Sequence, residues 1–448
     1  MANEWQVLTV DQIKASDDRS IAIGPFGSRM KADTYVTSGV PVIRGNNISG
    51  TKIFSGDFVF VSEQTADELR ACNVFAGDLV FPHRGAIGQV GIVPQDGFPR
   101  YMLSTSLMKL TCDRTVADPL FVFYFFRSVS GRNALLEHAS TVGTPGIGQP
   151  LTSLRSIKLP IPPLEEQRAI AHILGTLDDK IELLRKQSET IEAMARGLYK
   201  AWFVDFEPVR AKLEGRWQRG QSLPCLPAHL YDLFPDRLVE SELGEIPEGW
   251  DVTSLSEFSS LNPESWTKRT RPGEIRYVDL SNTKWGRIES VTKYDADDAP
   301  SRAQRVLRPL DTIVGTVRPG NGSYALISDE GLTGSTGFAV LRPLRRECSE
   351  FVYLAATARE NIERLSNLAD GGAYPAVRPE IVSATQVPHV GQELINEFSR
   401  QVRSMLAGIA DNELKSRLLA QLRDTLLPKL ISGELRVPDV DRIVGAAV

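Results

Sequence analysis

The residue types that most often perform chemistry in proteins are few and scattered in this sequence. Its five histidines lie far apart with no metal-ligand spacing, and its four cysteines form no C-x-x-C pair. A phosphate-binding GxxxxGK[ST] loop is excluded because the chain contains no Gly-Lys pair. No NPPY-like segment is present to hold an extrahelical adenine beside a methyl donor. We therefore expect no catalytic site, no metal site and no cofactor bound by this chain.

The composition is that of a soluble globular protein with more than one domain. The chain has 448 residues, of which 42% are hydrophobic and 24% charged, and this length predicts roughly two to four folding units. No apolar run is long enough to cross a bilayer and no secretory leader is present, so we expect a cytoplasmic protein without membrane association. A net charge of -5 argues against coating nucleic acid by bulk electrostatics, although it permits local basic surfaces.

A weak internal repeat organises the chain. "WQVLTVDQI" from Trp5 resembles "WDVTSLSEF" from Trp250, and "AGDLVFPHRGAIGQVGIV" from Ala76 resembles "PLDTIVGTVRPGNGSYALI" from Pro309. Short apolar runs bounded by Gly, Pro, Asn and Asp predict strands in both copies. Helical stretches follow, from Asp118 in the first copy and from Cys348 in the second. A repeat this long indicates duplication of a whole domain.

A long charged helix is predicted at the end of each copy. Apolar residues recur at alternating steps of four and three along both helices, which is the pattern of a coiled-coil seam. Ile170 to Trp202 spans about 48 Å at roughly 1.5 Å per residue. Neither stripe can be buried within one small domain, so we expect the two helices to pack on each other in antiparallel directions. The predicted seam comprises Ile170, Leu174, Leu177, Ile181, Leu184, Ile191, Leu198, Phe398, Val402, Met405, Ile409, Leu419 and Leu426.

The predicted fold class is α+β, with two mixed α/β globular domains separated by two long antiparallel helices that form an intramolecular coiled coil. A proline-rich stretch without sustained periodicity predicts a connector before the second copy. The predicted boundaries are 1–160 for the first globular domain, 161–206 for the first helix, 207–248 for the connector, 249–390 for the second globular domain, 391–432 for the second helix and 433–448 for the tail.

Two segments carry a resemblance to a known family. "IKLPIPPLEEQRAIAHILGTLDDKIELLRKQSETIEAMARGLYKAWFVDF" from Ile157 resembles the central conserved region of the specificity subunits of Type I restriction and modification enzymes. "NELKSRLLAQLRDTLLPKLISGEL" from Asn412 resembles their distal conserved region. The resemblance covers nearly the whole chain in the family order of target-recognition domain, helix, target-recognition domain, helix.

The resemblance implies a non-catalytic subunit that reads a two-part asymmetric site on double-stranded DNA, with one half per recognition domain. The paired helices would set the gap between the half-sites. Two modification subunits, which methylate adenine, and restriction subunits, which translocate and cleave DNA, would be the partners. S-adenosylmethionine, ATP and magnesium would be bound by those partner subunits.

Given that resemblance, loops with Arg, Lys, Asn or Gln beside glycine are the candidate DNA contacts. Arg or Lys reads guanine and Asn or Gln reads adenine, while glycine lets the backbone approach phosphates. "TKRTRPGEIR" from Thr267 is the favoured phosphate-binding stretch, and Arg84 and Arg318 occupy matching loops. The alternative interpretation of each candidate is an ordinary turn residue that is exposed to solvent and contacts no DNA. The candidates are Arg29, Arg44, Asn46, Asn47, His83, Arg84, Thr144, Lys268, Arg269, Arg271, Arg276, Asn282, Lys284, Trp285, Arg318, Asn321 and Tyr374.

Three further questions concern the helices. The aromatic cluster Tyr199, Trp202, Phe203 and Phe206 fits either a docking surface for a modification subunit or a local core under the first domain. Pro428 is expected to end or kink the second helix near Leu427, with Gly433 as a stop. Whether Arg423 lies on the seam or faces outward is open.

One competing function remains at this point. Two tandem domains on a helical scaffold could instead bind protein or carbohydrate. Salt-sensitive binding to duplex DNA, together with a genomic neighbour encoding an adenine methyltransferase, would distinguish the DNA reader from such a scaffold.

Overall fold

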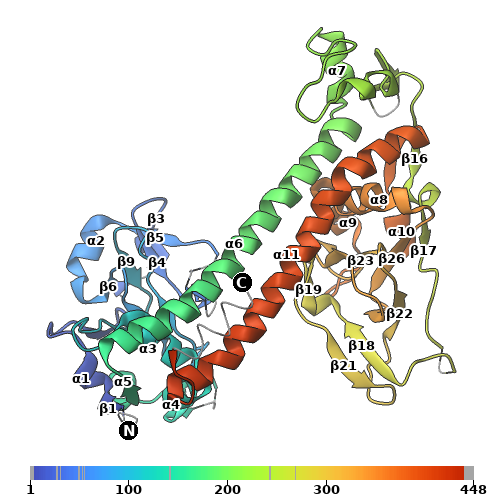
Figure 1. Cartoon of the computed structure of the whole chain (residues 1–448). Helices are drawn as coiled ribbons and strands as arrows, with labels where there is room; N and C mark the ends of the chain where they lie inside the picture. Colours follow the sequence, from blue (N-terminus) through green and yellow to red (C-terminus); the bar gives the residue numbers. More distant parts are fainter. Residues whose placement is uncertain are drawn as a thin grey trace. The chain divides into compact units, whose positions relative to one another are not determined.

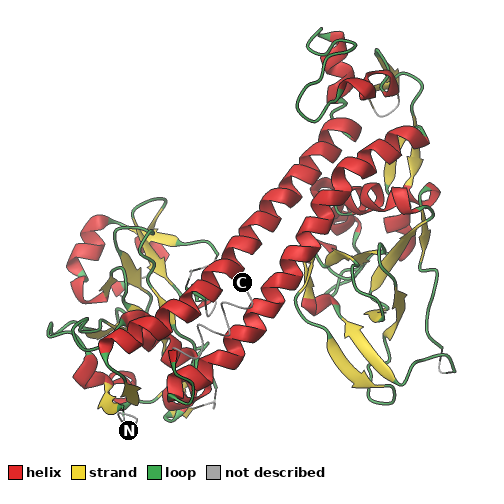
Figure 2. Cartoon of the chain, in the orientation of Figure 1, coloured by secondary structure: helices red, strands yellow, loops and turns green. Residues whose placement is uncertain are grey.

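The chain divides into two compact units in a computed structural model that describes residues 5–26, 29–30, 32–48, 51–52, 54, 56–140, 143–241, 244–267 and 269–437. Unit 1 comprises Met1–Leu184 and Lys415–Val448, and unit 2 comprises Arg185–Leu414. Two long helices, α6 (Leu164–Phe203) and α11 (Gln392–Ser432), each contribute one part to each unit (Figure 1). The predicted α+β fold class is confirmed (Figure 2).

Unit 1 contains two principal sheets. One has the order β2-β10-β7-β8 and the other the order β3-β5-β4-β9-β6. β1 pairs with β13 in an antiparallel ladder, and β11 pairs with β12. The strands are β1 (Gln6–Thr9), β2 (Ile21–Ile23), β3 (Tyr35–Val36), β4 (Val40–Ile43), β5 (Val59–Val61), β6 (Asn73–Val74), β7 (Leu79–Pro82), β8 (Gly91–Ile92), β9 (Tyr101–Leu103), β10 (Leu107–Leu110), β11 (Ala139–Ser140), β12 (Gly146–Ile147) and β13 (Lys158–Ile161). The shorter helices are α1 (Val10–Ile13), α2 (Glu63–Glu68), α3 (Pro119–Arg127), α4 (Val129–Leu136) and α5 (Pro150–Ser156).

Unit 2 also contains two principal sheets, of order β17-β26-β23-β24 and β21-β18-β25-β22. β16 pairs with β27, β14 with β15, and β19 with β20. The strands are β14 (Leu238–Ser241), β15 (Gly244–Pro247), β16 (Asp251–Ser254), β17 (Ser259–Leu261), β18 (Glu274–Val278), β19 (Thr283–Lys284), β20 (Arg287–Ile288), β21 (Thr292–Asp295), β22 (Ala303–Leu307), β23 (Thr312–Gly315), β24 (Tyr324–Leu326), β25 (Leu332–Ser335), β26 (Phe338–Pro343) and β27 (Gln386–His389). The shorter helices are α7 (Glu207–Leu213), α8 (Ser349–Ala356), α9 (Arg359–Leu368) and α10 (Pro379–Ser383).

The two units repeat one topology. The order β2-β10-β7-β8 corresponds to β17-β26-β23-β24, strand for strand along the chain. In the second sheet of each unit a parallel pair, β4-β9 or β18-β25, lies between two antiparallel strands. The helical stretches predicted from Asp118 and Cys348 form α3-α4 and α8-α9. The predicted internal repeat is therefore a duplication of a complete fold.

The start of α6 is fixed by polar contacts with α3. Asp118 caps α3 by accepting hydrogen bonds from the Leu120 and Phe121 amides, and Pro119 occupies the first turn. Gln167, in the first turns of α6, is fully buried. Its side chain accepts from the Asp118 amide and donates to the Val116 and Pro162 carbonyls. The glutamine of "PPLEEQ" thus anchors the long helix to the globular part of unit 1.

The two long helices contact each other inside each unit. In unit 1, Arg423 Nη1 lies 2.7 Å from Asp178 Oδ1, which answers the question of where Arg423 points. In unit 2, Asn412 Nδ2 lies 3.4 Å from Ser188 Oγ, and the rings of Trp202 and Phe398 are 5.7 Å apart. From Ser188 to Trp202 the residue numbers rise along α6, while their partners on α11 fall from Asn412 to Phe398. The two helices are therefore antiparallel in unit 2.

Every predicted seam residue is at least half-buried. A coiled coil along the full length of both helices nevertheless stays a prediction, because the contacts are established within each unit separately. The buried seam residues are Ile170, Leu174, Leu177, Leu184, Leu198, Phe398, Val402 and Leu426, and the half-buried ones are Ile181, Ile191, Met405, Ile409 and Leu419.

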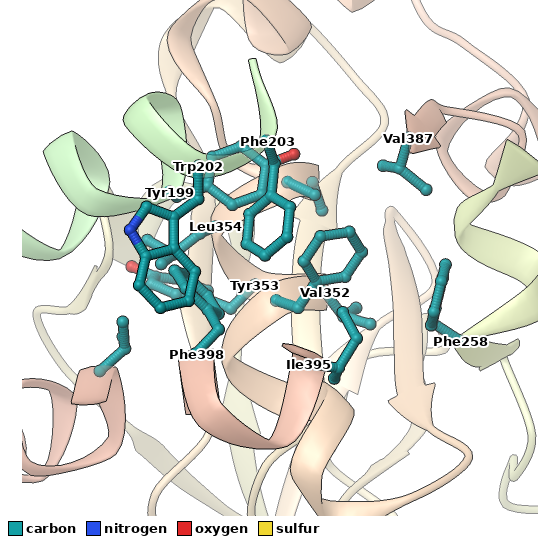
Figure 3. Packing of buried hydrophobic residues seen from close by; sticks show 14 of the residues in the cluster. Tyr199, Trp202, Phe203, Phe258, Val352, Tyr353, Leu354, Val387, Ile395 and Phe398 are labelled. Atoms are coloured by element: carbon teal, nitrogen blue, oxygen red, sulfur yellow. The ribbon is translucent and has the colours of Figure 1, made fainter. Parts of the chain in front are cut away.

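The aromatic cluster at the end of α6 belongs to the core of unit 2. Tyr199, Trp202 and Phe203 pack with Phe398 of α11 (Figure 3), and Phe206 packs on Trp250. All four rings of the cluster are 9% exposed or less. The docking-surface assignment is therefore wrong, because buried rings offer no surface to a partner. The alternative of a core under the first domain is also wrong, because the rings belong to the core of unit 2.

Helix α11 ends at the glycine and not at the proline. Pro428 lies inside the helix, which continues to Ser432, so the expectation that it ends near Leu427 is wrong. Gly433 then adopts a φ of 75°, and the Leu435 amide donates to the Lys429 carbonyl. Left-handed glycine backbone directly after the last turn is a common helix stop.

Residues between α6 and β16 form a small packed segment in unit 2. It contains α7, a 3₁₀ helix at Ala228–Leu233 and the β14-β15 hairpin. Trp217 is buried there, and Lys212 Nζ lies 4.0 Å from the ring centroid of Tyr231. This stretch of the chain is therefore held by a local aromatic core.

Candidate nucleic-acid interface

In unit 1 the structure joins the loop after β7 to the loop before β12. The Gly85 amide donates to the Pro145 carbonyl at 2.8 Å, and the Ile147 amide donates to the His83 carbonyl at 2.9 Å. Arg84 and Thr144, from these two loops, are both exposed. The Arg84 guanidinium makes no hydrogen bond or ion pair with the described residues. Two of the predicted contact loops therefore form one surface that presents a free arginine.

Two predicted contacts in unit 1 are structural residues. His83 is 6% exposed, and its Nε2 lies 3.1 Å from the Thr105 carbonyl. Burial lowers the pKa of His83, which favours the neutral imidazole. Asn47 is fully buried, where its Oδ1 accepts from the Arg44 amide and its Nδ2 donates to the Asp57 carbonyl. The assignment of these two side chains to DNA contact is wrong for this conformation.

The remaining candidates in unit 1 differ in exposure and in how far their polar atoms are already hydrogen-bonded within the chain. Arg29 and Asn46 are exposed. Arg44 is half-buried, and its Nη2 donates to the Asp57 carbonyl at 2.9 Å. This arginine holds the two ends of its own loop together, so it has less capacity for an external partner than Arg84.

In unit 2 the matched loops meet in the same way. The Arg318 amide donates to the Pro375 carbonyl at 2.7 Å, and Val317 forms an antiparallel bridge with Ala376. The Arg318 guanidinium lies 4.7 Å from the ring centroid of Tyr374 and donates to the Ala373 carbonyl. Tyr374 is 71% exposed. The correspondence of Arg84 and Arg318, inferred from weak sequence identity, is thus matched by equivalent loop pairs.

Trp285 sits at the tip of a strained hairpin beside these loops. β19 and β20 are joined by the two residues Trp285 and Gly286, with φ values of 48° and 86°. Such a type I′ turn normally takes Asn-Gly or Gly-Gly, and left-handed backbone costs a bulky residue about 1–2 kcal/mol. The Trp285 amide donates to the Gly322 carbonyl, and the ring packs on Gly322 and edge-on to Tyr324. The ring is nevertheless 55% exposed.

A cavity of about 690 Å³ opens beside Trp285. It is large enough for a nucleobase or an aromatic side chain. Arg196, which lines it, donates to the Thr357 carbonyl at 2.8 Å and also bonds Glu192. Sequence reasoning missed this cavity, because its walls come from α6, the β19-β20 hairpin, the segment from Gly320 to Tyr324 and α9 with the preceding Thr357. The lining includes Arg196, Trp285, Gly320, Tyr324, Thr357 and Arg359.

The basic stretch of unit 2 uses part of its charge internally. Arg271 Nη2 donates to the Pro300 and Ala303 carbonyls, and Arg276 Nη1 donates to the Glu330 carbonyl. Arg269 is exposed, and Lys268 lies outside the described residues. The favoured phosphate-binding stretch therefore presents fewer free cations than its composition implies. Of the other candidates, Lys284 and Asn321 are exposed and Asn282 is half-buried.

The described residues contain no group of three or more His, Cys, Asp or Glu side chains arranged to hold a metal ion. Burial raises the pKa of the Cys72, Cys112 and Cys348 thiols, which keeps them protonated and unreactive. None of the helices that the structure describes is long and apolar enough to span a bilayer.

Comparison with known proteins shows which proteins this chain is similar to. Residues 26–193 match the family model described as Type I restriction modification DNA specificity domain. The HindI specificity subunit of Haemophilus influenzae is 25% identical over 405 residues, covering 80% of this chain and 86% of that protein. The MjaVIII specificity subunit of Methanocaldococcus jannaschii is 23% identical over 353 residues, covering 76% of each chain.

A solved structure shares the fold. The S subunit of a Type I restriction-modification system from M. genitalium superposes with a TM-score of 0.54 at 16% identity, covering 96% of this chain and 97% of that one. Residues 26–193 are therefore similar to the DNA specificity domain of Type I restriction and modification enzymes, and the chain is similar to the specificity subunits of these enzymes over most of its length.

Proposed function

We propose that this chain is the non-catalytic DNA-reading subunit of a Type I restriction-modification complex. Each unit reads one half of a bipartite, asymmetric site on duplex DNA. Two modification subunits, which methylate adenine, and the restriction subunits assemble on it. S-adenosylmethionine, ATP and magnesium belong to those partners.

The observation that carries the proposal is the duplicated pair of loops. In each unit an exposed arginine, Arg84 or Arg318, stands at the end of an equivalent strand and is bridged to a glycine-rich loop. Arginine donates in a fork that matches guanine O6 and N7. Two copies with different neighbouring residues suit two different half-sites, which is what an asymmetric recognition sequence requires.

The helices support the second element of the proposal, a fixed gap between the half-sites. α6 has 40 residues and α11 has 41, so each is about 60 Å long at roughly 1.5 Å per residue. We propose that they pair along their whole length and act as a spacer between the two reading units. A duplex turn advances about 34–36 Å, so such a spacer suits half-sites separated by several base pairs.

Mapping of adenine methylation tests the function directly. A host carrying this chain and its neighbouring methyltransferase should methylate one asymmetric bipartite sequence. Arg84→Ala should relax or abolish recognition in one half-site only, and Arg318→Ala in the other half-site only, by about 1–3 kcal/mol per base pair read. Arg155→Ala, which removes an exposed arginine paired with Asp11, is the matched control and should leave the methylated sequence unchanged.

The contrary outcomes are equally specific. A uniform loss across all sequences would identify Arg84 as a phosphate contact. Methylation that does not depend on this chain, combined with no salt-sensitive binding to duplex DNA, would overturn the proposed function and favour a scaffold that binds protein or carbohydrate.

A further inference from the structure

A second polar cavity lies in unit 1, at the opposite end of β7 from the Arg84 loop. Its volume is about 540 Å³, and its lining includes two buried charged residues, Asp78 and Lys109, which are 4% and 5% exposed. Five cationic side chains line it, against three acidic ones: Arg19, Arg70, Arg100, Lys109 and Arg114, with Asp17, Asp67 and Asp78. Because Arg84 follows β7 while Asp78 precedes it, this cavity is separate from the candidate DNA-reading loops.

Polar atoms in this cavity lack partners. Ser20 is 2% exposed and Asn73 is 3% exposed, and neither Ser20 Oγ nor Asn73 Oδ1 has a hydrogen-bond partner among the described residues. A buried polar atom without a partner has lost its hydrogen bonds to water and gained none in return, so native proteins rarely leave one without a role. Both residues line the cavity, so these two atoms without partners lie next to the space that a ligand would fill.

Lys109 is incompletely paired. Its Nζ donates to the Asn73 carbonyl at 2.8 Å and lies 4.0 Å from Asp78 Oδ2. The carboxylate of Asp78 is already engaged, since it accepts from the Thr111 hydroxyl at 2.6 Å and from the Phe75 amide at 2.9 Å. Burial lowers the pKa of Lys109 and raises that of Asp78, as expected where neither charge is fully compensated.

In unit 2 the aspartate that corresponds to Asp78 is fully paired with a cationic side chain. Asp311 precedes β23 as Asp78 precedes β7, and it accepts from the Arg308 amide at 2.9 Å. Both of its carboxylate oxygens accept from Arg342, at 2.9 Å each. Arg342 and Arg308 in turn hold a second carboxylate, that of Glu264. The cation beside the matched aspartate thus binds a second carboxylate in unit 2, whereas among the described residues of unit 1 only Asp78 forms an ion pair with Lys109, at 4.0 Å.

We propose that the unit 1 cavity binds a ligand that carries a carboxylate and a neighbouring hydrogen-bond donor. The carboxylate would accept from Lys109, Arg19 and the Ser20 hydroxyl, in the role that Glu264 plays in unit 2. The donor would satisfy Asn73 Oδ1. A free hydroxy acid or amino acid has this chemistry, and so does an acidic side chain with its backbone amide on a partner protein.

Calorimetric titration of the full chain at constant ionic strength tests the proposal. L-malate should bind at one site, and more tightly than glutarate, which lacks the hydroxyl donor for Asn73. Lys109→Met should weaken malate binding at least tenfold, and Arg19→Gln several-fold. Arg308→Gln removes an exposed arginine from the completed cluster of unit 2, so it is the matched control and should have no effect. Arg19 is exposed, so its variant remains informative if Lys109→Met fails to fold.

The outcomes distinguish a small-molecule ligand from an acidic segment of a partner protein, and they also test the proposal itself. If malate binds, the ligand is a free carboxylate. If malate does not bind but Arg19→Gln and Lys109→Met both weaken the affinity for the methyltransferase, with Arg308→Gln unchanged, the ligand is an acidic segment of that partner. If neither occurs, or if inorganic phosphate binds more tightly than malate, the proposal is overturned. The first titration contains no DNA, so its result is independent of the proposed DNA-reading function.

Discussion

Arg423 of α11 and Asp178 of α6 form a hydrogen-bonded ion pair in unit 1, with 2.7 Å between Nη1 and Oδ1. The same carboxylate accepts from the Tyr124 hydroxyl at 2.7 Å and from Arg127 Nη1 at 2.8 Å. The Asp178 side chain is only 7% exposed. One buried aspartate therefore joins both long helices to α3.

Asp178→Ala should destabilise the chain strongly, because it leaves two guanidinium groups without their buried anion. Breaking a buried pair in this way costs about 3–5 kcal/mol, which a lower urea midpoint would report. Asp424→Ala removes a 64% exposed partner of the same arginine and should cost less than about 1 kcal/mol. Equal midpoints for the two variants would contradict the assignment of Asp178 as the junction.

The length of the helices should determine the gap between half-sites. Ser188 faces Asn412, so deleting residues 185–191 together with 409–415 removes one facing heptad from each helix. At roughly 1.5 Å per residue this shortens the pair by about 10 Å, or about three base pairs at roughly 3.4 Å each. Methylation mapping should show a shorter gap between unchanged half-sites.

The inverse change is the control for this spacer. Duplicating the same two heptads should lengthen the gap by the same amount. An unaltered gap in both the deletion and the duplication would refute the spacer, whereas altered half-sites would show that the reading units themselves had been disturbed.

Trp285→Asn should separate stability from DNA binding. Asparagine tolerates the left-handed backbone of this turn, so stability should stay constant or rise by up to about 1 kcal/mol. Affinity for the DNA site should fall by about 1–3 kcal/mol if the indole stacks on a base. Thermal unfolding and a binding titration measure the two effects, and Trp285→Phe should recover part of the affinity. A loss of stability with unchanged affinity would instead make Trp285 a structural residue.

The stability of unit 2 at low pH should depend on Glu264. Its hydrogen bonds from Arg308 and then Arg342 lower its pKa to about 2, from a usual value of 4.5. Because the folded pKa is the lower one, the stabilisation is complete above about pH 4.5 and is lost as the pH falls towards 2. The difference in Tm between the wild-type chain and Glu264→Gln should therefore shrink over that range, and a constant difference would contradict this account.

The sequence predicts those parts of the fold that are determined by local pattern. The repeat, the strand-rich and helical parts of each copy and the two long helices follow from short-range periodicity and from segments in the same order. The matched positions of Arg84 and Arg318 were predicted for the same reason. Pro428 shows the limit of this approach, because the packing of Leu426, Leu427 and Leu430 keeps the helix intact beyond it.

The candidate site was harder to predict, because exposure depends on distant neighbours. His83 and Asn47 have the residue types of DNA contacts, but Thr105 and Asp57 occupy their polar atoms. Trp202 and Phe203 are buried by Phe398, almost two hundred residues further along the chain. No local pattern reports such contacts, and the cavity beside Trp285 depends on four separate segments in the same way.

The pairing of β1 with β13 and of β16 with β27 has an evolutionary consequence. Gln6 stands opposite Ile161 and Asp251 opposite His389, so each globular part begins and finishes at neighbouring points, directly before a long helix. A foreign segment with the same paired ends could be inserted between such points by two crossovers while the helices stayed untouched. If each globular part reads one half-site as proposed, such an exchange would replace a whole half-site in one step instead of by accumulated point changes.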